Sequence, residues 1–84
     1  MKLLVKLTNG KTIQINNIKN NDTIEVLKMH TAYNSNIPMH QFELYWNDTL
    51  LSPDNLSLEE IELNGEKLPL NQYNVNNVII MRLH

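Results

Sequence analysis

The histidines, carboxylates and hydroxyl groups are the side chains of this sequence that could do chemistry. His30, His40 and His84 lie too far apart for the short ligand spacings of zinc sites. No Ser, His and Asp stand in an arrangement typical of nucleophilic catalysis, and no glycine-rich segment could cradle a phosphate. Cysteine is absent, which excludes a thiolate nucleophile and a disulfide. We therefore expect no enzyme activity, no cofactor and no metal site.

An acidic run is the most concentrated charge in the chain. It comprises Glu59, Glu60, Glu62 and Glu66. Such a run is more often a solvated loop face than a docking loop, and both interpretations stay open. Overall, seven basic and nine acidic residues give a net charge of −2, and the basic residues are scattered. A nucleic-acid partner is not expected, because it would require a basic stripe.

The chain length bounds the architecture. Eighty-four residues make a single domain, 1–84, with one core and little room for a deep cleft. No stretch is apolar for long enough to cross a membrane, and the short apolar start is not a signal peptide. We expect a monomer in the cytoplasm, the nucleus or both.

Alternation of apolar and polar residues predicts a hairpin at the start of the chain. A strand over Met1–Leu7 has its odd residues on the buried face, and Thr8–Lys11 supplies turn chemistry. In the second strand Ile13 and Ile15 alternate with polar residues. One residue too many at 16–17 then suggests a bulge.

A helix is predicted from Asp22 or Thr23, either of which can cap it, to about Ser35. Asn36 is a plausible left-handed C-cap.

The buried face of this helix is expected to carry Ile24, Leu27 and Thr31, with Met29 beside them. Thr31 is the weak point of the pattern. Either its hydroxyl bonds back to a carbonyl, or the helix is slightly rotated and buries Tyr33.

The rest of the chain adds three predicted strands. Phe42–Trp46 alternates, with Trp46 on the core side, and a turn leads to a short strand at Leu50–Leu51. The last strand is Val78–Leu83. Residues 52–77 are expected to form loop and short helical turns, with a turn at Asn64-Gly65. This order predicts an α+β fold, in which one helix packs across a mixed sheet.

Motifs along nearly the whole chain resemble those of the ubiquitin family. They are Met1, Val5-Lys6, Gly10–Ile13, Asp22–Glu25, Lys28, Ile37-Pro38, Gln41, Leu44, Leu51, Leu70, Tyr73-Asn74 and Arg82-Leu83. The likeness is closest over residues 1–51. It implies a β-grasp fold with an insertion between the fourth and last strands.

Two alignments place the insertion differently. Leu70–Val75 is similar to the family's short helical turn, which would make Pro53–Lys67 the insertion. Ser57–Ile61 also resembles that turn, and the insertion would then be Asn64–Val75. We favour the first alignment because Tyr73-Asn74 is the rarer match.

The ending Arg82-Leu83-His84 departs from family members that become attached to other proteins, which end in a glycine pair. Conjugation of the chain as it stands is therefore not expected. Two alternatives stay open. One is a modifier whose glycine pair follows His84, and the other is a regulatory ubiquitin-like domain of a deubiquitinase or ligase.

The resemblance also implies a binding surface. The family's apolar patch falls on Thr8, Tyr45, Val78 and Ile80, and Leu7 could supply the apolar side chain that Thr8 lacks. Arg82 matches a family arginine, whereas Glu43 stands where a second arginine is usual. We therefore expect a non-catalytic interaction domain for ubiquitin-receptor or proteasome-type domains and apolar helices. Its expected binding residues are Leu7, Thr8, Glu43, Tyr45, Val78, Ile80 and Arg82.

Overall fold

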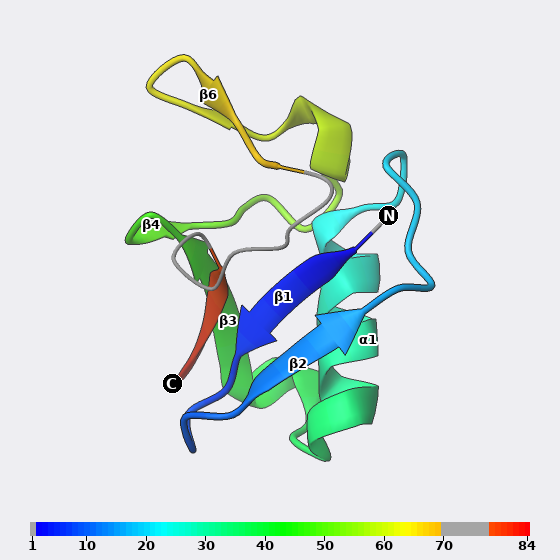
Figure 1. Cartoon of the computed structure of the whole chain (residues 1–84), viewed down its shortest axis with the longest axis vertical. Coiled ribbons are helices and arrows are strands. Elements are labelled where there is room, and N and C mark those ends of the chain that lie inside the picture. Colours follow the sequence, from blue (N-terminus) through cyan, green and yellow to red (C-terminus); the bar gives the residue numbers. More distant parts are fainter. Residues whose placement is uncertain (1, 70–77) are drawn as a thin grey trace.

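A mixed five-stranded sheet with one helix packed across it forms the fold (Figure 1). The computed structural model describes residues 2–69 and 78–84. Helix α1 spans Ile24–Ser35. The strands, in their order across the sheet, are β2 (Thr12–Ile15), β1 (Leu3–Lys6), β7 (Ile79–Leu83), β3 (Phe42–Trp46) and β4 (Thr49–Leu50). The predicted α+β class is confirmed.

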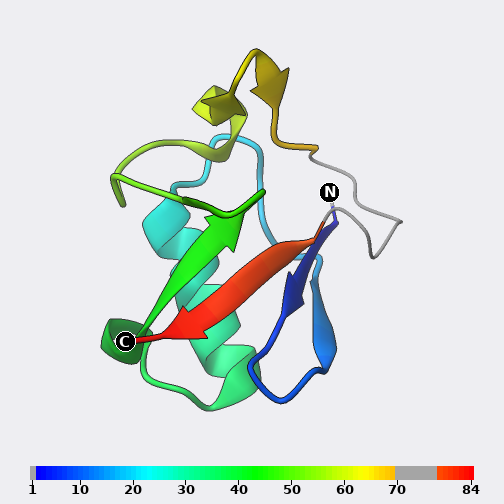
Figure 2. The same cartoon turned by 90° about the vertical axis from the view of Figure 1, so that its left-hand side faces the viewer.

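Strand β7 lies at the centre of the sheet, between β1 and β3 (Figure 2). It is parallel to β1, where Val5 pairs with Ile79, and antiparallel to β3, where Tyr45 pairs with Ile80. This register buries Ile79 and Met81 and leaves Ile80 half-buried on the other face. The expected facing of the last strand is confirmed.

Polar caps define both ends of α1. The Thr23 hydroxyl accepts a hydrogen bond from the Val26 N–H at 3.3 Å, so Thr23 is the N-cap. The Asp22 carboxylate instead accepts from the Lys19 N–H. At the other end Asn36 has φ 59° and donates its N–H to the Ala32 carbonyl. The predicted helix boundaries are confirmed.

The buried face of α1 contains Ile24, Leu27 and Thr31, all with no exposed surface. The Thr31 hydroxyl donates to the Leu27 carbonyl at 2.8 Å, which confirms the first of the two alternatives for this residue. Tyr33 is 85% exposed, so the helix is not rotated toward it. The expectation for Met29 was wrong, because it is 54% exposed. Two helical steps of about 100° place Met29 on the opposite side of the helix from Leu27.

One apolar core lies between α1 and the sheet. Trp46 is fully buried in it, as the alternation of β3 predicted. The buried cluster consists of Leu3, Val5, Leu7, Ile15, Ile18, Ile24, Leu27, Phe42, Leu44, Trp46, Leu51, Leu58, Ile61, Leu68, Ile79 and Met81. Within the described residues, no helix is long and apolar enough to cross a membrane.

The segment after β4 contains more structure than the sequence predicted. A 3-10 turn, η2, covers Leu58–Glu60. It is followed by the small hairpin β5 (Glu62–Leu63) and β6 (Glu66–Lys67). Asn64 and Gly65 both have positive φ in the hairpin turn, which confirms the predicted turn. Each strand has only two residues, too few for an alternating pattern to be visible.

The turn η2 occupies the position expected from the second alignment. Its Leu58 N–H donates to the Asp22 carbonyl at 2.8 Å, and the Glu59 N–H donates to the Asn20 carbonyl. The helical turn of the first alignment, Leu70–Val75, lies outside the described residues.

Two elements differ further from expectation. A second 3-10 turn, η1 (Met39–Gln41), precedes β3, and β2 ends at Ile15, so the expected bulge at 16–17 lies beyond the paired strand.

Thr31→Val should stabilise the domain by about 0.5–1 kcal/mol in urea unfolding. Valine keeps the shape of the buried side chain and removes a hydroxyl, while the Leu27 carbonyl keeps its helical N–H donor. Thr31→Ser, which keeps the hydroxyl and loses the methyl group, should destabilise by about 1 kcal/mol. A loss of stability in the valine variant would show that the hydrogen bond from the Thr31 hydroxyl stabilises the domain by more than the burial of that hydroxyl costs.

Candidate functional site

The sheet face opposite α1 carries a continuous row of side chains. Tyr45 pairs with Ile80 on one side and with Leu50 on the other, and Ile80 also pairs with Lys6. Directly paired residues share a face, so Lys6, Ile80, Tyr45 and Leu50 form what we call the outward row. Leu50 is 41% exposed, and Tyr45 and Ile80 are half-buried. The row therefore offers solvent an apolar strip across β7, β3 and β4.

Arg82 lies on the rim of the outward row. Its guanidinium stands 4.5 Å from the centroid of the Tyr45 ring, and its Nη2 is 2.9 Å from Oδ1 of Asp48 in the β3–β4 turn. This ion pair is exposed, so it adds little stability. The Tyr45 ring and the Asp48 carboxylate together orient the Arg82 guanidinium, which they hold over the ring.

The remaining expected patch residues occupy different environments. Val78 is half-buried just before β7, and Thr8 is exposed in the turn after β1. Leu7 does not face this surface. It is only 9% exposed and belongs to the core cluster, so the expectation that it adds apolar surface beside Thr8 was wrong. The reason is the alternation of β1, whose odd residues face the helix.

Glu43 pairs with Arg82 in the β3–β7 register, yet its carboxylate contacts a different cation. Oε2 of Glu43 accepts a hydrogen bond from Lys28 Nζ at 2.7 Å, and Oε1 lies 3.6 Å from His84 Nε2. The same ammonium donates to Oδ1 of Asp54 at 2.9 Å. The negative charge expected at the patch edge is therefore bound within the domain.

Lys28 is buried although it is charged, with a side chain 5% exposed. Burial by itself would lower the pKa of Lys28. The hydrogen bonds to Glu43 and Asp54, with the attraction of both carboxylates, outweigh that effect and raise the pKa above its ordinary value of 10.5. Lys28 therefore stays protonated and joins α1 to β3 and to the loop after β4.

The structural role of Lys28 escaped the sequence reasoning, which treated it only as a lysine that the family keeps. A signal was present, because Ile24, Leu27, Lys28 and Thr31 follow the i, i+3, i+4, i+7 spacing of one helix face. Lys6 and Lys11 are exposed, whereas the Lys28 ammonium is enclosed.

Across residues 2–69 and 78–84, no three carboxylate or imidazole groups gather as metal ligands.

Replacing Lys28 by Met should lower the free energy of unfolding by about 2 kcal/mol in urea titration. The change leaves two carboxylates facing each other without a cation, and their partial exposure keeps the cost below that of a fully buried pair. Adding Glu43→Gln and Asp54→Asn to Lys28→Met should restore at least half of the loss. If the triple variant were no more stable than Lys28→Met, packing of the lysine stem would explain the loss instead.

Stability should also depend on alkaline pH. A pKa raised on folding contributes stability that is fully present below the unfolded value of 10.5 and is lost as pH rises through the higher folded value. We expect the thermal midpoint to fall above about pH 10.5 more steeply than in Lys28→Met, measured by circular dichroism. Parallel curves for the two proteins would show that other lysines and the tyrosines cause the decline.

Comparison with known proteins identifies the family of this chain. A sequence search of curated proteins finds no significant match. The profile of the ubiquitin family matches residues 3–72, a range that contains β1, β2, α1, β3 and β4. The match covers well over half of the chain and agrees with the mixed sheet and its single packed helix. The chain therefore belongs to the ubiquitin family.

Proposed function

We propose that this ubiquitin-like domain performs no catalysis and acts by being bound, through the outward row, by partners of the ubiquitin-receptor type. The observation that carries the proposal is the position of Tyr45 between Ile80 and Leu50 on the sheet face opposite α1. Contiguous apolar surface on a small domain commonly marks an interaction site. Tyrosine is enriched among binding hot spots because it offers a large area at low ordering cost.

The shape of this surface favours an apolar helix as the partner element. The apolar part of the row runs across three strands, and a helix can lay its apolar face along such a strip. Arg82 limits one side of the strip and is already oriented by Tyr45 and Asp48. The partner helix would therefore meet an arginine whose ordering cost has been met during folding.

The charges around the row support a partner that relies little on electrostatics. Arg82 is paired with Asp48, and Glu43 is paired with Lys28. Lys6, at the β1 end of the row, is exposed, but a single cation attracts a charged partner only weakly over long distances. Affinity would come from apolar contact with Tyr45, Ile80 and Leu50. We expect micromolar binding, about −8 kcal/mol.

Tyr45→Ala should weaken binding of a synthetic apolar helix from a ubiquitin receptor about thirtyfold, which equals about 2 kcal/mol. The change removes the central side chain of the row. Isothermal titration calorimetry at equal protein concentrations measures the effect, and circular dichroism verifies that the variant remains folded.

Tyr33→Ala is the matched control, since it makes the same substitution at an exposed tyrosine on α1. It should leave the affinity unchanged. Two rim residues, Glu43 and Arg82, could be varied to test the edge of the row. Glu43→Arg would place a second cation beside Lys28 and disturb the fold, so Arg82→Gln is the suitable variant. Equal losses from Tyr45→Ala and Tyr33→Ala, or a Tyr45→Ala affinity within twofold of the original, would refute the outward row as the binding surface.

A further inference from the structure

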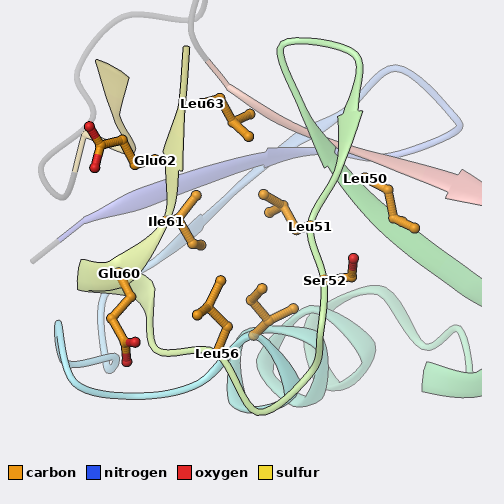
Figure 3. Close-up of a pocket in the computed structure, with 9 residues that line it drawn as sticks. Leu50, Leu51, Ser52, Leu56, Glu60, Ile61, Glu62 and Leu63 are labelled. Atoms are coloured by element: carbon orange, nitrogen blue, oxygen red, sulfur yellow. The ribbon is translucent and has the colours of Figure 1, made fainter. Parts of the chain in front are cut away.

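A narrow hollow lies beside the outward row, between the chain that leaves β4 and the segment η2–β5 (Figure 3). Leu51 and Ile61 point toward each other across it. Ile24 of α1 also lines it, and all three of these residues are buried members of the core cluster. Leu56 and Leu63 complete its apolar walls and are half-buried. The hollow is therefore an opening into the apolar core, walled by two loops.

The size of the hollow limits what can enter. Its volume is about 110 Å³. An engineered apolar cavity of roughly 150 Å³ holds one benzene molecule, so this hollow suits a single aliphatic side chain and is too small for a helix. Leu50, at 41% exposure, stands at its edge and also belongs to the outward row. The two surfaces adjoin, but they accept partner elements of different shape.

Charge at the hollow has one sign. Glu60 and Glu62 line it from the η2–β5 side, where the Glu62 side chain points away from Leu51 (Figure 3), and its lining contains no cationic residue. The Glu60 carboxylate accepts a hydrogen bond from the Ser57 hydroxyl at 2.6 Å. Within residues 2–69 and 78–84, neither Glu60 nor Glu62 forms an ion pair. These glutamates belong to the acidic run in the sequence, and the fold sets them beside an apolar opening.

We propose that this hollow binds a short protein segment in which a leucine, isoleucine or valine stands next to lysine or arginine. The aliphatic side chain enters between Leu51 and Ile61, and the neighbouring cations approach Glu60 and Glu62. Apolar burial supplies the affinity, and the carboxylates supply the preference for a basic segment. The inference does not depend on the outward row, because the hollow has its own lining apart from Leu50.

The test is an NMR titration of the full ¹⁵N-labelled chain with three blocked tripeptides. Acetyl-Lys-Leu-Lys-amide should shift the amide signals of Leu51, Leu56, Ile61 and Leu63. Acetyl-Lys-Gly-Lys-amide lacks the apolar anchor and acetyl-Glu-Leu-Glu-amide reverses the charge, so each should bind at least about fivefold more weakly. Higher salt should weaken the Lys-Leu-Lys peptide selectively.

A pair of double variants separates local from general charge effects. Glu60→Gln with Glu62→Gln should weaken binding of acetyl-Lys-Leu-Lys-amide about fivefold. Glu59→Gln with Glu66→Gln changes the net charge equally at exposed residues outside the lining, and it should leave the affinity unchanged.

Several results would overturn the proposal. They are equal losses in the two double variants, equal binding of the Leu and Gly peptides, shifts confined to Tyr45 and Ile80, and no saturable shift at all. Shifts at the hollow that grow with protein concentration alone would assign it to a second copy of the chain. Failure of the outward row in calorimetry would leave these outcomes unaffected.

Discussion

The buried ammonium of Lys28 is the interaction on which the two proposed binding surfaces depend. Its stem lies in the core face of α1, while its nitrogen binds Glu43 on β3 and Asp54 in the loop after β4. Strand β3 carries Tyr45, and the loop carries Leu51 and the wall of the hollow. One cation therefore fixes helix, sheet and loop relative to one another. An apolar residue there could pack but could not hold two carboxylates.

Two charged residues at the edge of the outward row, Glu43 and Arg82, are paired within the domain. Glu43 binds Lys28 inside the molecule, and Arg82 binds Asp48. The face that remains is apolar at Ile80, Tyr45 and Leu50 and carries the exposed cation Lys6 at its β1 end. Negative charge without an ion pair among the described residues lies on the η2–β5 segment, at Glu60 and Glu62 beside the hollow. The two proposed surfaces therefore differ in chemistry: the outward row is mainly apolar, whereas the hollow combines an apolar opening with carboxylates.

Asparagine has a local use in this chain. Asn36 ends α1 and Asn47 and Asn64 begin tight turns, all with positive φ. Asparagine adopts this left-handed conformation at lower cost than most residues. The turns therefore fall where the fold needs them, and they set the ends of α1, β3 and the β5–β6 hairpin. The boundaries of these three elements are therefore set by residues next to them in the sequence.

The sequence by itself determined the elements whose signals are local. Alternation fixed the facing of β3, with Trp46 buried and Tyr45 outward, and capping chemistry fixed the ends of α1, because these effects act over a few residues. Tertiary structure alone decided what Lys28 binds and where the hollow opens. Lys28, Glu43 and Asp54 are far apart in the chain, and only folding brings them within hydrogen-bond distance. The two-residue strands β5 and β6 likewise depend on long-range packing, because so short a segment has no periodicity to read.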